Sequence, residues 1–137
     1  MKRLLFLSTA PVLLFFATAW IEPTKRTKTL SASEVIAVDG DTIDHSDDRY
    51  RLVGFDAPET FRAQCEAEKA LGLRAKGRLT EIIQTNGQVE LEINPKLDRY
   101  GRFLAIARVS GKEVGSILVS EGFARPYAGG ERRSWCG

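Results

Sequence analysis

The chain has 137 residues, a length typical of one domain, and its 43% hydrophobic and 28% charged residues are ordinary for a globular protein. Residues 20–137 carry 18 Lys and Arg against 18 Asp and Glu, so this part is neutral, which excludes the bulk positive charge of a protein that coats nucleic acid. One histidine and two cysteines are too few for a histidine-rich or four-cysteine zinc site, so any metal ligands are expected to be oxygens.

The first residues have the layout of a secretory signal peptide. A short basic pair, Lys2-Arg3, precedes an apolar run from Leu4 to Ile21, and Ala17-Thr18-Ala19 matches the small-residue pattern of a cleavage site. A polar stretch with Pro23 follows and indicates a linker. The expected division is therefore a signal peptide over residues 1–19, a linker over residues 20–30 and a folded domain over residues 31–137.

The alternative to cleavage is a membrane anchor formed by residues 4–21, because 18 residues approach the length that spans a bilayer. The expected location is periplasmic or secreted after cleavage, and the membrane without it. Export would permit a disulfide, and Cys65 and Cys136 are the only cysteines in the chain. We expect them to bond and to tie the C-terminal tail to the start of a helix, with two free thiols as the alternative.

Five short segments have the composition of β-strands, and turn dipeptides such as Asp39-Gly40 separate the first three as in a meander. A polar pair, Asn94-Pro95, is expected to open a loop after the fourth. The expected strands are residues 34–38, 42–45, 50–55, 88–93 and 103–109.

Two segments have the spacing of helices. Residues 65–84 place apolar side chains on one face, and residues 114–121 form a shorter helix that Gly122 would end. Periodicity alone predicts an α+β domain with a meander. One architecture that suits this order is a five-stranded OB-fold β-barrel with two or three outer helices.

Three segments concentrate unusual polar chemistry: Asp39-Gly40-Asp41-Thr42, the run from Arg51 to Thr60, and Asp98-Arg99-Tyr100-Gly101-Arg102. Asp41 and Asp56 follow strands, where two carboxylates can converge on one cation. Glu59 follows Pro58, which fixes the local backbone, and a carboxylate held near a metal can orient or deprotonate an attacking water.

Two arginines in these segments add a second kind of chemistry. The guanidiniums of Arg51 and Arg102 can clamp a phosphoryl group and stabilise charge that builds on its oxygens. Each residue alone has an ordinary alternative role as a turn, a cap or a surface charge. Taken together, the three acids and two arginines predict a phosphoryl-transfer site.

In their order and spacing, these segments resemble the signature of the thermonuclease, or staphylococcal nuclease, family. The resemblance runs from about Ser31 to Tyr127 and includes the stretch from Leu118 to Arg125. It implies an OB-fold barrel with outer helices. It also implies calcium-dependent hydrolysis of phosphodiester bonds in DNA and RNA with little sequence preference.

The resemblance also assigns roles to individual residues. Asp41 and Asp56 match the calcium-binding carboxylates, and Ala57 falls where the family uses a backbone carbonyl as a ligand. Glu59 matches the residue that acts on the attacking water. The two phosphate-binding arginines of the family match Arg51 and Arg102.

Aromatic contacts to the nucleotide are less well marked in this sequence. Tyr100 and Tyr127 are candidates for substrate contact, with ordinary barrel packing as the alternative. Arg99 and Arg125 are candidates for lining the phosphate path, with solvated surface as the expected role. The Cys65–Cys136 pair is expected to tether the tail where the family's type member has a further helix.

Two rival functions are compatible with the same fold. The first is a non-catalytic OB-fold module of the cell envelope that binds nucleic acid or protein, and the second is a membrane-tethered protein whose nuclease-like domain is structural. All five site side chains are present, which favours the enzyme. DNA and RNA are the expected partners, no obligate protein partner is expected, and a membrane is involved only if residues 4–21 are not cleaved.

Overall fold

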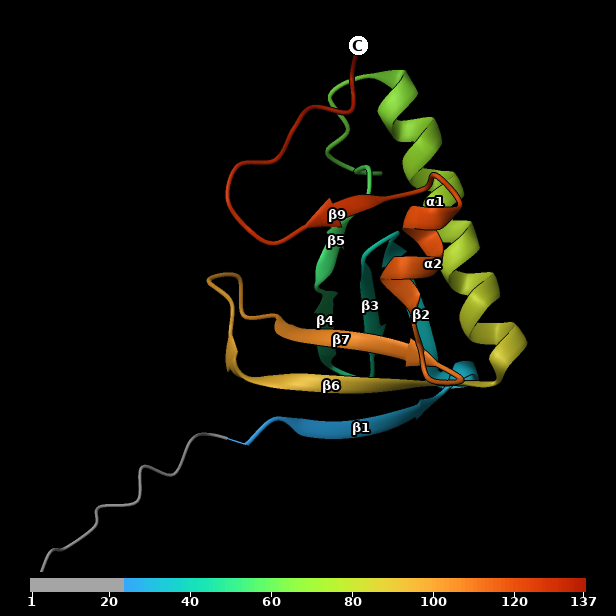
Figure 1. The fold of residues 1–137 in the computed structure, drawn as a ribbon, viewed down its shortest axis with the longest axis vertical. Coiled ribbons are helices and arrows are strands. Elements are labelled where there is room, and N and C mark those ends of the chain that lie inside the picture. Colours follow the sequence, from blue (N-terminus) through green and yellow to red (C-terminus); the bar gives the residue numbers. More distant parts are fainter. Residues whose placement is uncertain (1–23) are drawn as a thin grey trace, which may run out of the picture.

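A curled mixed sheet forms the body of the computed structural model, which describes residues 24–137 (Figure 1). Its strands are β1 (Arg26–Ser31), β2 (Val35–Asp39), β3 (Thr42–His45), β4 (Asp48–Leu52), β6 (Gln88–Leu97), β7 (Phe103–Val109) and β8 (Lys112–Glu113). They run in the order β1-β6-β7-β4-β3-β2, and β8 pairs with β7. A separate two-stranded sheet joins β5 (Gly54–Asp56) to β9 (Arg125–Tyr127). The helices are η1 (Ala32–Glu34), α1 (Glu66–Asn86) and α2 (Val114–Ser120).

One parallel pairing joins the two halves of the main sheet. The meander β2-β3-β4 is antiparallel, as is the pair β6-β7, but β4 and β7 run parallel with Tyr50 opposite Phe103 and Arg51 opposite Leu104. The two rings of Tyr50 and Phe103 stack with their centroids 5.4 Å apart. This register places residues near 51 beside residues near 102, which are distant in sequence.

The core lies between the inner face of this sheet and the two helices. Val89, Leu91 and Ile93 alternate along β6 and are buried, as a half-buried strand requires. On α1, Leu79 and Ile83 are buried at a spacing of four residues and join the same core cluster. Burying a side chain of this size contributes roughly 1.5–3 kcal/mol, so the alternating pattern holds the sheet and helix together.

The expected α+β, OB-type fold is confirmed, and all five expected strands and both expected helices are present. The helix over α1 begins after Cys65 and ends at Gly87, whose φ of 81° is the left-handed conformation that suits glycine. At the end of α2, Gly122 takes the position after the cap, and Phe123 donates its N–H to the carbonyl of Leu118.

Several details of the expected element list were wrong. Residues 26–30 of the expected linker belong to β1, because β1 pairs with β6 along its whole length. The expected third strand is broken, because Gly54 has a φ of 96° and turns the chain from β4 into β5. The expected loop at Asn94-Pro95 lies within β6, where the register with β7 shifts between Ile93 and Leu97.

The expected signal peptide and the alternative membrane anchor lie outside the described residues. Of the expected linker, residues 24–30 are described. Between residues 24 and 137, none of the helices combines the length and the apolar character that a bilayer crossing needs.

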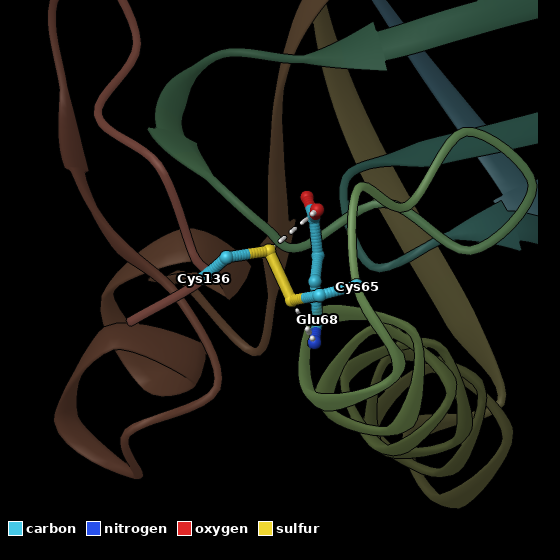
Figure 2. A group of neighbouring side chains, drawn as sticks. All are labelled: Cys65, Glu68 and Cys136. Carbon is cyan, nitrogen blue, oxygen red and sulfur yellow. Dashed lines mark hydrogen bonds between the residues drawn. A yellow bond between two sulfur atoms is a disulfide. The ribbon is translucent and has the colours of Figure 1, made fainter.

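The C-terminal tail after β9 loops over β5 and returns to the loop before α1 (Figure 1). There a disulfide joins Cys65, the N-cap of α1, to Cys136, as the sequence predicted. The carboxylate of Glu68 lies beside this bridge, with Oε2 3.9 Å from Sγ of Cys136 (Figure 2). Because a bonded sulfur has no proton to donate, this is a contact and not a hydrogen bond.

We expect the disulfide to stabilise the fold by closing a long loop. The two cysteines are 71 residues apart, and a closed loop of this length restricts the unfolded chain by about 4 kcal/mol in the chain-entropy description. Replacing Cys65 and Cys136 together by serine should lower the free energy of unfolding by up to that amount in urea titrations. Wild-type protein under a thiol reductant is the matched control, and unchanged midpoints in both would contradict this role.

Candidate active site

Two aspartates are buried where the meander meets the small sheet. Asp41 lies in the turn between β2 and β3 and is 6% exposed, and Asp56 ends β5 and is 2% exposed. Oδ2 of Asp41 accepts the backbone N–H of Ala57 at 3.1 Å, and Oδ1 accepts the hydroxyl of Thr42 at 3.0 Å. Burial raises the pKa of Asp41, although the neighbouring Arg51 acts to lower it.

Glycine is required in the turn that carries Asp41. A Cβ on Gly40 would lie 2.7 Å from the Cβ of Ala75 and 2.8 Å from the Cβ of Ala57. The turn therefore packs directly on α1 and on the residue after Asp56. This close approach places Asp41 within hydrogen-bonding distance of the Ala57 backbone.

Arg51 is the buried cation of the site, with 5% of its surface exposed. Its Nη2 lies 3.1 Å from Oδ2 of Asp41 and 3.9 Å from Oδ1 of Asp56. Its guanidinium also donates to the backbone carbonyls of Leu52 and Phe55. Burial lowers the pKa of Arg51, and the two aspartates act in the opposite direction, so the acids offset part of the cost of burying this charge.

Glu59 lies on a loop whose backbone packs against α1. A Cβ on Gly72 would lie 2.6 Å from the carbonyl oxygen of Glu59 and 2.8 Å from that of Pro58, so the helix touches the loop backbone directly. The buried carboxylate of Glu68 accepts the N–H of Glu59 at 3.3 Å and the N–H of Gln64 at 2.7 Å. These contacts fix the backbone on which Glu59 stands.

The side chain of Glu59 lies among other acids. Burial raises its pKa, and the carboxylates of Asp39 and Asp41 raise it further. The hydroxyl of Thr60 donates to Oδ1 of Asp39, which orients this fourth acid toward the same region. Together, Asp39, Asp41, Asp56 and Glu59 are referred to below as the acid cluster.

Arg102 begins the turn into β7, on the other side of the parallel pairing from Arg51. Oδ2 of Asp98 accepts its Nε at 2.8 Å, and Oδ1 accepts the backbone N–H groups of Arg102 and Tyr100, both at 2.9 Å. Burial acts to raise the pKa of Asp98, but these hydrogen bonds outweigh it and hold the pKa below its ordinary value. Asp98 therefore stays ionised and keeps the Arg102 fork oriented.

Two adjoining cavities surround these residues. One, of about 700 Å³, is lined by Arg51 and Arg102 among others, and the second, of about 480 Å³, is lined by Asp56 and Glu59. Arg132 from the C-terminal tail lines both. The structure therefore brings the two arginines to one cavity and two of the acids to its neighbour, on one side of the molecule.

The two tyrosines are placed differently. Tyr127 lines the larger cavity, and its hydroxyl donates to the carbonyl of Gly130 at 2.6 Å. Tyr100 is 63% exposed and lies outside the cavity lining, with the guanidiniums of Arg99 and Arg102 4.8 and 5.2 Å from its ring centroid.

The sequence analysis missed the contribution of the C-terminal tail. Arg125, expected to be solvated surface, lies 3.6 Å from Oδ2 of Asp56 and stacks on Trp135. Trp135 donates its Nε1–H to the same oxygen at 3.1 Å, and Arg132 contacts both Asp56 and Glu59. The signal was available in the Arg132-Arg133 pair and in Trp135 beside Cys136, because the expected disulfide returns those residues to the start of α1.

The acid cluster suits a hard divalent cation. Oδ1 of Asp56 is buried and accepts no hydrogen bond, although the guanidiniums of Arg132 and Arg51 lie 3.3 and 3.9 Å away, so its surroundings already favour positive charge. Asp41 and Glu59 both have raised pKa values, so nearby positive charge would stabilise their ionised forms. Within residues 24–137, the only three potential ligand groups whose atoms all lie within 4.8 Å are Cys65, Glu68 and Cys136, whose sulfurs are bonded to each other.

An OB-type sheet that holds buried acids beside two arginines defines a class of small α+β domain able to bind a phosphoryl group. Residues 49–134 match the family model described as "Staphylococcal nuclease homologue". The match covers more than half of the chain, so the chain belongs to the staphylococcal nuclease homologues, and the resemblance noted in the sequence is confirmed.

Curated relatives agree with this assignment. The chain is 38% identical over 94 residues to the thermonuclease of Staphylococcus intermedius, an alignment that covers 64% of this chain and 54% of the relative. In Bacillus subtilis (strain 168) it is 36% identical to the SPbeta prophage-derived endonuclease YokF and 35% identical to endonuclease YncB, each over 94 residues. Those two alignments cover 65% of this chain, but 31% and 44% of the relatives, so the chain spans about half or less of each relative.

Proposed function

We propose that the protein is a nuclease that hydrolyses phosphodiester bonds of DNA and RNA with the help of one calcium ion. The observation that carries this proposal is the meeting of the acid cluster and the arginine-lined cavity on one side of the molecule. The names of the relatives, a thermonuclease and two endonucleases, support the same reaction class.

In this proposal, Asp41, Asp56 and the backbone carbonyl of Ala57 hold the cation. The bound cation would supply positive charge to a non-bridging phosphate oxygen and so favour attack on phosphorus. Both aspartates are buried, so bulk water does not compete with the cation for their oxygens. The hydrogen bond from the N–H of Ala57 to Asp41 fixes the position of that carboxylate relative to Ala57.

The remaining chemistry falls to three charged side chains. Glu59, on the loop held by Gly72 and Glu68, orients the attacking water or takes its proton. Arg51 and Arg102 face the phosphate from the adjoining cavity and stabilise the negative charge that grows on its oxygens in the transition state. Arg51 is fixed by burial, and Arg102 by Asp98.

Removal of calcium is the first test. Purified protein should digest single-stranded DNA, duplex DNA and RNA in calcium, lose that activity in a chelator specific for calcium, and regain it when calcium is restored in excess. The readout is release of acid-soluble nucleotides. Equal activity in calcium and in chelator would exclude the metal role, and no activity in either would favour the non-catalytic binding module.

We also propose that the domain works outside the cytoplasm. The disulfide between Cys65 and Cys136 supports this location, because such bonds persist in oxidising compartments. The arrangement of the first 19 residues supports export as well. Cell fractionation would separate a released protein from an anchored one.

A further inference from the structure

The C-terminal tail is fastened over the acid cluster at several points. The disulfide fixes Cys136 to the start of α1. The guanidinium of Arg125 donates to the carbonyls of Arg133 and Ser134 and lies 3.8 Å from the ring centroid of Trp135. Arg125 therefore acts mainly as a clamp for the tail, although it also lies near Asp56.

Arg132 projects from this fastened tail into the acid cluster. Its Nε lies 3.3 Å from Oδ1 of Asp56, and its Nη1 donates to Oε1 of Glu59 at 3.2 Å. The contact with Asp56 is an ion pair that leaves Oδ1 without an aligned hydrogen bond. One guanidinium therefore bridges the proposed metal ligand and the proposed base.

The guanidinium of Arg132 occupies the space between Asp56 and Glu59 that a bound cation would also need. Asp56 and Glu59 both turn oxygens toward Arg132, and within residues 24–137 the acid cluster contains no three carboxylates whose oxygens all lie within 4.8 Å. A divalent ion brings its oxygen ligands to 2.3–2.6 Å for calcium, so the ligands must close around it. A guanidinium between two of the acids opposes that closure, both by its volume and by its charge.

The side chain of Arg132 has room to move away from the carboxylates. Its side chain is 40% exposed, whereas that of Arg51 is 5% exposed. It lines both cavities, so a swing toward the larger one would carry it from the carboxylates to the place where a phosphate is expected. Tyr127, whose ring centroid lies 5.6 Å from the guanidinium, offers a surface along that path.

We propose that Arg132 is a tethered counter-ion of the acid cluster, which a divalent cation must displace, and that the Cys65–Cys136 disulfide keeps it in competition with that cation. This inference rests on the proposed calcium site. The affinity for the cation would then depend on the position of the C-terminal tail as well as on the ligands. Reduction of the disulfide would release the tail and ease entry of the cation.

Calcium binding measured by isothermal titration calorimetry, without nucleic acid, tests the inference. Arg132→Gln should bind calcium about tenfold more tightly than the wild type, because one positive charge near the site is gone. Arg132→Lys keeps the charge and should stay near the wild type. Arg74→Gln removes a charge from an exposed position on α1 and should change nothing.

The thiol reductant provides the second arm of the experiment. Reduction should raise the calcium affinity of the wild type and leave that of Arg132→Gln unchanged, because the variant has no guanidinium bridging Asp56 and Glu59 for the tail to carry away. If Arg132→Gln binds calcium no more tightly than the wild type, the counter-ion role is wrong while the calcium site stands. If reduction tightens both proteins equally, the tether role is wrong. If neither protein binds calcium, the proposed cofactor fails together with this inference.

Discussion

Replacing Glu59 by glutamine should lower kcat for DNA hydrolysis by a factor of roughly 10²–10⁴, the range that a positioned general base contributes. Glutamine keeps the size of the side chain and its contact with Arg132 but cannot accept a proton. KM should change little, because Glu59 acts on the water and not on the substrate. Steady-state digestion of a labelled oligonucleotide would separate the two constants.

Glu66→Gln is the matched control for Glu59. This exposed acid lies in the first turn of α1, seven residues further along the chain, and is expected to leave kcat unchanged. Thermal unfolding should show both variants folded, because the loop backbone is held by Glu68 and by Gly72. Wild-type kcat in Glu59→Gln would remove this residue from the mechanism.

The second large effect is expected at Arg102. Arg102→Lys keeps one positive charge but loses the planar fork that matches two phosphate oxygens, and we expect kcat to fall about 10²–10³-fold. The loss should appear mainly in kcat, since the charge that Arg102 meets grows in the transition state. The same assay gives the answer, with Arg74→Lys as the control on an exposed helix face.

Arg102 is the better probe of the two arginines. Arg51 is buried against Asp41 and Asp56, and its replacement would leave the buried carboxylate of Asp41 without its ion-pair partner, which would destabilise the fold by about 3–5 kcal/mol. Arg102 is held by a single carboxylate, that of Asp98, near the surface. A variant at Arg102 that unfolds at the wild-type temperature yet retains full activity would contradict the proposed role.

The sequence predicted the fold class because its strongest patterns are local. Alternation in β6 and the helical spacing in α1 depend on neighbours a few residues away. Both elements formed and began within one residue of the expected start, although β6 runs on to Leu97 and α1 to Asn86. Boundaries failed where a distant partner decides them. Residues 26–30 look like part of a polar linker until β6 is present to pair with them, and the split at Gly54 is explained by the pairing of β5 with β9.

The candidate site divides in the same way. The five predicted site residues stand in compact segments of the sequence. In the structure Arg51 contacts Asp41 and shares a cavity with Arg102, while Asp56 and Glu59 line the neighbouring cavity. Arg132 and Trp135 belong to no such segment. Their position follows from a disulfide between residues 71 apart, which no periodic pattern can report, and from the arginine clamp within the non-periodic tail.

The pairing of β5 with β9 also has a consequence for the timing of synthesis. Asp56 lies opposite Arg125, so the strand that carries this carboxylate has no partner until 69 further residues have left the ribosome. At about 5–20 residues per second, that interval is several seconds. The ion pair of Asp56 with Arg125, like those of Asp56 and Glu59 with Arg132, can therefore form only when the chain is nearly complete.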